Sequence, residues 1–253
     1  MPVKDPLDFN RAIIDATADL VCAYKPNIAF YEALGMDGLR ALEGTIDHIR
    51  KAAPNTVILG DAKRGDIGST APAYAKAMFQ VWGFDAVTVN AWGGYDGLEP
   101  FLEDPARGVF IWCRGSNPGS ADLQDLTVNT LDGPIPLYQH LARSADGWNR
   151  NGNIGLVMGA TNPDQLADVR SLCPHMPLLI PGVGAQGGDL ADAVLAGMDR
   201  NGRRALINSS RGIIYARPEP GGSQDFAAAA RQAAARLRDQ INRILTDAGK
   251  GWL

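Results

Sequence analysis

The chain has 253 residues, of which 45% are hydrophobic and 21% charged, and its formal net charge is −4. These values are typical of a globular protein, and the slight acidity argues against a general nucleic-acid binder or a basic membrane-surface protein. The first residues lack the apolar core of a signal peptide, and no apolar run approaches the ~20 residues of a membrane span. We therefore expect a cytoplasmic protein without nucleic-acid or membrane partners.

Apolar runs typical of strands alternate along the chain with patterns typical of helices. The expected strands are 20–26, 56–63, 86–91, 108–114, 155–160, 178–184 and 205–212. The expected helices include 6–19, 38–53, 72–83, 136–149, 162–173 and 223–249, the last beginning at Ser223 and Gln224 and ending at Gly249. This alternation predicts parallel strands joined by right-handed crossovers. Because no linker divides the chain, we expect one domain over residues 1–253.

Seven strands that follow an opening helix fit two architectures. One is a (β/α)8 TIM barrel lacking its first strand at the N-terminus, and the other is an open doubly wound sheet. One connection is unusually long: after residue 114 we expect turn residues and a short irregular stretch before helix 136–149. Its pattern fits a functional loop and a tolerated insertion equally well.

The stretch GDAKRGDIGST, residues 60–70, places charged side chains where an apolar strand ends. Asp61 and Lys63 are two residues apart and share one face, at the end of the strand where parallel α/β proteins hold their active sites. Asp66 lies just beyond, and Lys25 ends the neighbouring strand, so a Lys25–Asp61–Lys63–Asp66 charge chain is predicted. Such a cluster suits proton delivery to a carbanion beside a strained carboxylate. An ion pair that only caps the strand end is an equally good interpretation.

A glycine-rich stretch, PGVGAQGGD at 181–189, directly follows another expected strand. Its G-x-G-x-x-G spacing, which includes Gly184, comes too late in the chain for a dinucleotide fingerprint. It favours phosphate binding by backbone amides, with Gln186 as a further donor and Arg211 as a guanidinium suited to phosphate oxygens. The alternative is that the glycines only form turns and that Arg211 is a surface charge.

Polar groups follow a third strand in RGSNPGS, residues 114–120. Ser116 and Asn117 are placed to recognise a polar ring edge, although a plain turn fits equally well. No metal site is expected, because neither the histidines nor the cysteines show ligand spacing. Packing in a reducing compartment is favoured over a redox or metal role for the three cysteines: Cys22, Cys113 and Cys173. Two of them sit in apolar runs and are expected to be core thiols.

Four motifs together resemble the orotidine 5′-phosphate decarboxylase family, in its longer bacterial branch: DAKRGDIGST, KPNIAFYEALG, PGVGAQGGD and SSRG. The similarity runs from about residue 20 to residue 215. The combination of D-x-K-x-x-D-I with P-G-V-G-A-Q-G-G-D is specific, because related sugar-phosphate decarboxylases share only the D-x-K-like strand. The resemblance therefore favours the barrel over the doubly wound sheet.

The resemblance implies a homodimer that converts orotidine 5′-phosphate to uridine 5′-phosphate without a metal or an organic cofactor. Lys63 would donate a proton to the ring carbon that loses carbon dioxide. Asp61 would lie beside the substrate carboxylate and hold Lys63, and Lys25 would touch the ribose.

The same resemblance implies further roles for residues in three loops. Three of them would reach across a two-fold interface into the partner's site: Asp66, Ile67 and Thr70. Ser116 would bind the pyrimidine, and the phosphate would be held by Gln186 and Arg211, beside the amide of Gly184.

The chain departs from the family pattern at its start. The family's first strand carries an aspartate that holds the ribose hydroxyls, and no such stretch precedes helix 6–19. We therefore expect a gapped, seven-stranded barrel with weakened ribose binding, unless Met1 is an internal methionine of a longer reading frame. Two other functions stay open: a related sugar-phosphate decarboxylase that uses a metal-held enediolate, and a phosphate-ligand-binding barrel without turnover.

Overall fold

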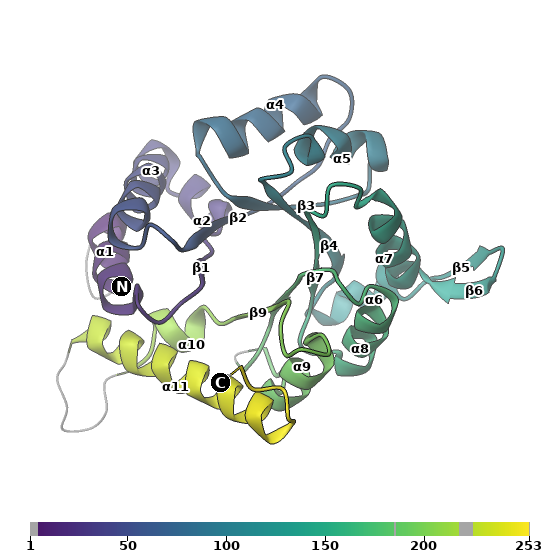
Figure 1. The fold of residues 1–253 in the computed structure, drawn as a ribbon. Helices are drawn as coiled ribbons and strands as arrows, with labels where there is room; N and C mark the ends of the chain where they lie inside the picture. Colours follow the sequence, from purple (N-terminus) through teal and green to yellow (C-terminus); the bar gives the residue numbers. More distant parts are fainter. Residues whose placement is uncertain (1–4, 185, 218–224, 253) are drawn as a thin grey trace.

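The computed structural model describes residues 5–184, 186–217 and 225–252, and its main feature is a parallel sheet curved into an open barrel (Figure 1). The barrel strands are β1 (Ala23–Tyr24), β2 (Val57–Arg64), β3 (Ala86–Val89), β4 (Gly108–Arg114), β7 (Ile154–Met158), β8 (Leu178–Pro181) and β9 (Ala205–Asn208). They lie in this order in the sheet, and each neighbouring pair is parallel. Each strand falls on one of the seven expected apolar runs.

The prediction of a barrel without its first strand is confirmed. In the part of the chain that the structure describes, β1 and β9 are the two edges of the sheet, with no strand between them (Figure 1). Helix α11 (Phe226–Asp247) lies along this side and contacts α1 (Pro6–Thr17), α9 (Leu190–Gly197) and α10 (Arg211–Ile214). The expected weakening of ribose binding stays a prediction.

The remaining helices form the outer layer of the barrel. They are α2 (Ile28–Glu32), α3 (Gly35–Ala52), α4 (Thr70–Lys76), α5 (Tyr95–Leu102), α6 (Ala121–Gln124), α7 (Leu137–Trp148) and α8 (Pro163–Leu172). A 3₁₀ turn, η2 (Pro118–Ser120), precedes α6. The helix expected over 72–83 is two segments, because α4 continues into the π-helix η1 (Ala77–Val81).

Local capping groups set the ends of the first and last helices. Asp5 caps α1 by accepting a hydrogen bond from Leu7 N, and a proline at the first position suits the free end. Helix α11 begins at Phe226, with the Asp225 side chain accepting from Ala227 N. The predicted starting residues, 223 and 224, lie outside the described residues. At the other end Gly249 has φ +68°, the left-handed conformation that glycine adopts easily after a helix.

Two apolar layers lie on opposite faces of the sheet. The larger layer packs between the sheet and the surrounding helices, around fully buried residues such as Leu42, Phe101 and Leu166. The smaller layer fills the inside of the barrel with Leu59, Ala86, Phe110, Val157, Leu179 and Leu206. Because this layer closes the barrel interior, only the carboxyl ends of the strands above it are available for a polar site.

The stretch expected to be irregular after residue 114 contains a hairpin. Strands β5 (Thr127–Thr130) and β6 (Gly133–Pro136) pair antiparallel and project away from the barrel (Figure 1). Thr130 Oγ1 donates to Gly133 O at 2.7 Å and closes the turn. Strand β6 contains two prolines, and proline is tolerated here because each strand of a two-stranded hairpin is an edge.

No helix in the described residues is long and apolar enough to cross a membrane. Two of the three cysteines are core thiols, since Cys113 and Cys173 are buried, whereas Cys22 is exposed. Cys22 precedes the short edge strand β1, where one side of the chain has no neighbouring strand to cover it.

Candidate active site

One carboxylate at the mouth of the barrel binds two lysine side chains. Lys25 Nζ lies 2.7 Å from Asp61 Oδ2, and Lys63 Nζ lies 2.6 Å from Asp61 Oδ1. Lys25 directly follows β1, whereas Asp61 and Lys63 share one face of β2. The structure thus brings together three of the four residues of the expected charge chain.

Residues of both adjacent strands fix the Asp61 carboxylate. Its backbone N–H donates to Pro26 O at 2.9 Å. Its side chain accepts hydrogen bonds from Asn27 Nδ2 at 3.2 Å and from Thr88 Oγ1 at 3.0 Å, in addition to the two lysines. With only 9% of the side chain exposed, the carboxylate has little freedom to move.

The charge state of Asp61 follows from its neighbours. Burial alone would raise the pKa of this carboxyl, because desolvation penalises the charged form. The charges and hydrogen bonds of Lys25 and Lys63 outweigh burial, and the pKa lies below its ordinary value. At neutral pH the site therefore contains one carboxylate between two cations, which favours an anionic ligand.

Lys63 has an uncommon backbone conformation, with φ +46°. Among the described residues only Arg204 is another non-glycine residue with positive φ. The backbone N–H of Lys63 donates to Thr88 Oγ1 at 3.0 Å, and its carbonyl accepts from Asn90 Nδ2 at 3.2 Å. The ammonium lies 5.9 Å from the centroid of the Trp112 ring, in cation–π range. Side chains of β3 and β4 and of the loop after β3 thus set both the backbone and the head group of Lys63.

Asp66 does not join the charge cluster within this chain. Its Oδ1 accepts a hydrogen bond from Ile67 N at 2.8 Å, and Asp66, Ile67 and Thr70 are all exposed. The loop packs against α5, because a Cβ on Gly97 would lie 2.7 Å from Asp66 O. The three residues that the resemblance assigns to a partner's site therefore lie on the outside of this chain.

Two residues expected to bind the pyrimidine and the phosphate approach one another across the barrel mouth. Ser116, after β4, donates a hydrogen bond from Oγ to Gln186 Oε1, after β8, at 2.5 Å. Gly182 has φ +101°, and a Cβ there would lie 2.9 Å from both Gln186 Oε1 and Ser116 Cβ. Only glycine permits this close approach.

A hollow of ≈ 450 Å³ lies between the loops after β8 and β9 and helix α11. Gly184 and Ser209 are among its lining residues. Arg211, at the start of α10, is exposed and forms no hydrogen bond or ion pair with any other described residue. Within the described part of the chain, nothing therefore competes with an anion for its guanidinium. In the sheet four strands separate β9 from β2, which carries Asp61 and Lys63, and the hollow is lined by none of the lysines of the charge cluster.

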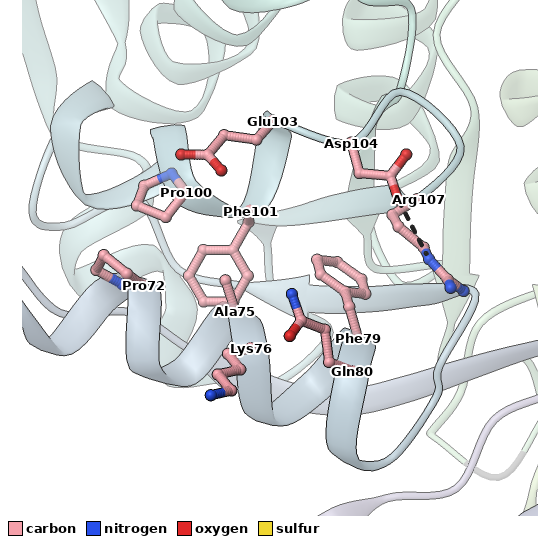
Figure 2. Close-up of a pocket in the computed structure, with 10 residues that line it drawn as sticks. All are labelled: Pro72, Ala75, Lys76, Phe79, Gln80, Pro100, Phe101, Glu103, Asp104 and Arg107. Carbon is pink, nitrogen blue, oxygen red and sulfur yellow. Dashed lines mark ion pairs between the residues drawn. The ribbon is translucent and has the colours of Figure 1, made fainter.

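A second hollow lies outside the barrel and is unrelated to the charge cluster. Figure 2 shows this space of ≈ 290 Å³ between α4 with η1 on one side and α5 on the other. Phe79 and Phe101 line it, and Asp104 pairs with Arg107 at 3.6 Å along its edge. It contains no residue of the expected site.

Three side chains that hold the cluster together were not expected from the sequence: Asn27, Thr88 and Trp112. Asn27 stands in the KPNIAFYE motif next to Lys25, so the motif offered a signal for it. Thr88 lies in the run AVTVNA, where a single hydroxyl among apolar residues is a weak signal. Trp112 offered no signal of a role in the site, because an aromatic residue in a strand is most often part of the core.

Histidine, cysteine and acidic side chains do not form a metal site, since the described residues include no group of three or more that are placed to hold an ion.

The parallel barrel, its outer helices and a charged site at the carboxyl ends of the strands define a (β/α)-barrel protein. A family model described as "Orotidine 5'-phosphate decarboxylase / HUMPS family" matches residues 5–224. The chain belongs to this family.

Curated relatives and solved structures agree with this assignment. Orotidine 5'-phosphate decarboxylase of Roseiflexus sp. (strain RS-1) is 53% identical over 252 residues, which are 97% of this chain and 89% of that protein. The protein of the same name from Paracidovorax citrulli is 51% identical over 236 residues, or 93% of this chain and 84% of the relative. The structure of Leishmania donovani OMP decarboxylase is 38% identical with a TM-score of 0.84, covering 96% of this chain and 90% of that one.

Proposed function

We propose that this chain decarboxylates orotidine 5′-phosphate to uridine 5′-phosphate. The observation that carries the proposal is the buried Asp61 carboxylate between the ammonium groups of Lys25 and Lys63. Family membership and relatives about half identical in sequence, which bear this name, support the same reaction. The reaction makes the chain a carboxy-lyase.

In the proposed reaction the bond between the pyrimidine ring and its carboxylate breaks. The electron pair stays on the ring carbon, carbon dioxide leaves, and Lys63 Nζ transfers a proton to that carbon. Lysine is regenerated by a proton from water. Because the carbanion is poorly stabilised, the barrier is high, and enzymes in general lower barriers by about 8–23 kcal/mol in total. A fixed ammonium beside the developing charge supplies electrostatic stabilisation toward that total.

The substrate carboxylate would lie next to Asp61, and the pyrimidine edge next to Ser116. Lys25, hydrogen-bonded to Asp61, would contact the ribose. The phosphate would bind at the opposite side of the mouth. Three residues carry that role: Gly184, Gln186 and Arg211. Binding energy from this distant phosphate is then available for organising the reacting end.

We also propose that the active unit is a homodimer in which Asp66, Ile67 and Thr70 complete the partner's site. Exposed apolar side chains on α2, which follows β1, and on the loops after β2 and β3 support this proposal. Phe30 is 74% exposed, Ile67 59% and Trp92 81%. Ile67 adjoins the loop after β3, because a Cβ on Gly93 would lie 3.0 Å from Ile67 Cγ2. Exposed apolar groups of this size, two of them on adjoining loops, are typical of an interface between copies. The free thiols fit a reducing cytoplasm, where we place the protein.

The test is an absorbance assay with orotidine 5′-phosphate, with carbon dioxide release and nucleotide binding measured on the same sample. We expect turnover by the wild type, and a loss of about 100- to 10,000-fold for Lys63→Ala as expected for a missing proton donor. Binding without release of carbon dioxide would instead indicate a non-catalytic barrel. Turnover abolished by a chelator would indicate the metal-dependent sugar-phosphate alternative.

A further inference from the structure

Two motifs of the sequence contain charged residues to which the reaction assigns no role. Glu32 ends the KPNIAFYE motif on α2, and Arg64 follows Lys63 in DAKR at the end of β2. In the structure these two residues form an ion pair, from Arg64 Nη2 to Glu32 Oε1. The pair joins the element that follows Lys25 to the strand that carries Asp61 and Lys63.

The Arg64 guanidinium makes two further contacts. Its Nη1 donates to Ala62 O at 3.4 Å, and its Cζ lies 5.7 Å from the centroid of the Tyr74 ring on α4. The side chain therefore extends toward the helix layer, between α2 and α4, and binds the backbone of its own strand. We call Glu32, Arg64 and Tyr74 the latch.

The latch flanks the strained residue of the site. Lys63 has φ +46°, and such conformations of non-glycine residues persist only where the surroundings hold them. Thr88 and Asn90 hold the peptide groups of Lys63 from the β3 side. Arg64 holds the same segment from the helix side, through Ala62 O and Glu32.

The Arg64 side chain is not optimised for stability. Its Nε is buried and has no hydrogen-bond partner among the described residues. A buried N–H without a partner is a cost to folding, and such costs concentrate at functional sites. A stabilising role alone does not explain a partly buried guanidinium with one buried donor unsatisfied.

We infer that the latch is a positioning device: Arg64, anchored by Glu32 and Tyr74, keeps Lys63 in its positive-φ conformation and its ammonium on Asp61. Arg64 touches no substrate in this account and acts only through Lys63. The inference rests on the proposed function, because a proton donor must be placed accurately to act. Release of the latch lets residues 62–64 relax to ordinary strand geometry and moves the Lys63 head group.

The test compares Arg64→Gln and Glu32→Gln with the wild type. We expect kcat to fall by about 100-fold in Arg64→Gln, the effect of displacing a reacting group by ~1 Å, while KM changes little because the phosphate and pyrimidine contacts remain. Arg40→Gln is the matched control, since Arg40 pairs with exposed Asp37 at 2.9 Å on α3 and has no link to the site. The charge-reversed double variant Glu32→Arg with Arg64→Glu should recover part of the lost kcat. An unchanged kcat in Arg64→Gln, or a rise in KM alone, would overturn the latch.

A second measurement does not depend on turnover. A crystal structure of Arg64→Gln should show Lys63 outside the positive-φ region and its Nζ displaced from Asp61. Lys63 in its present conformation would overturn the inference. The two proposals fail in different ways, because an inactive wild type contradicts the decarboxylase, whereas an unperturbed Lys63 in the variant contradicts the latch.

Discussion

The Nζ atom of Lys63 lies 2.6 Å from Oδ1 of Asp61, only two positions earlier on the same strand. Lys63 makes this short contact while its backbone has a positive φ of 46° at the end of β2. Asp61 is held more firmly than Lys63, since their side chains are 9% and 37% exposed. The carboxylate is therefore the fixed point of the site, and the lysine is the group placed against it.

The first prediction concerns Asp61→Asn. The variant keeps the shape of the side chain but leaves two ammonium groups without their shared carboxylate. Breaking a buried ion pair on one side costs about 3–5 kcal/mol, which is an upper bound here because the Lys63 side chain is 37% exposed, so we expect a lower free energy of unfolding in urea. We also expect decarboxylation to fall by about 100-fold or more, because Lys63 loses its anchor. Stability equal to that of the wild type would show that the two lysines do not depend on Asp61.

The second prediction concerns stability at acid pH. The pKa of Asp61 is lower in the folded chain than its ordinary value, so its ionisation stabilises the fold above pH 4 or so, and this contribution is lost as the pH falls through the folded pKa. Urea unfolding between neutral pH and pH 3 should therefore show a shallower decline for Asp61→Asn than for the wild type.

Asp19 provides a comparison for this pH experiment. The hydrogen bond from Arg231 lowers the pKa of Asp19 to about 2, far from the barrel mouth. Asp19→Asn should remove a separate part of the loss of stability at acid pH. The effects of Asp19→Asn and Asp61→Asn should add, because distant sites are independent. Identical pH dependence in the wild type and Asp61→Asn would contradict the proposed charge state of the site.

The alternation of strands and helices allowed most of the fold to be predicted. All seven barrel strands lie on expected runs, because each strand is buried between two apolar layers and is mostly apolar before its carboxyl end. The hairpin was missed, because Gly133, Pro134 and Pro136 are poor strand formers and its strands are held by their mutual pairing instead. The break between α4 and η1 gave no local signal either, since a π-helix depends on tertiary packing.

The part of the candidate site that lies on strands could be predicted from strand geometry. The period of two places Asp61 and Lys63 on one face, and parallel neighbours bring Lys25 beside them. Beyond the end of the strand, the alternation of side chains no longer predicts where a residue points. Asp66 follows Gly65 and precedes Gly68, which has φ +56°, so the direction of this loop could not be read from the residue pattern. Trp112 was missed for another reason, because an apolar strand does not reveal which of its alternating residues face the barrel interior.

The third prediction concerns Arg211→Ala. Because Arg211 is exposed and pairs with no other described residue, its removal should leave the melting temperature unchanged. We expect KM to rise by roughly 10- to 100-fold, the value of one or two charge-assisted hydrogen bonds to a phosphate. Arg200→Ala is the control, since Arg200 is also exposed but precedes β9 at the opposite end of the strand. Turnover of orotidine, which lacks the phosphate, should not change in either variant. A KM equal to that of the wild type would place the phosphate elsewhere.

The fourth prediction tests whether two chains share each site. Lys63→Ala and Asp66→Ala should each be nearly inactive alone, because each variant lacks one group in every site. If Asp66 acts in the partner's site, a mixed dimer of the two variants has one site with both defects and one site intact. Mixing equal amounts under exchange conditions should therefore restore about a quarter of the wild-type activity, since half of the dimers are mixed and each has one working site of two. If Asp66 instead serves its own chain, both sites of the mixed dimer carry one defect and no activity returns.

Trp92→Glu, on the exposed apolar surface, should weaken the dimer in sedimentation experiments and lower activity at low protein concentration.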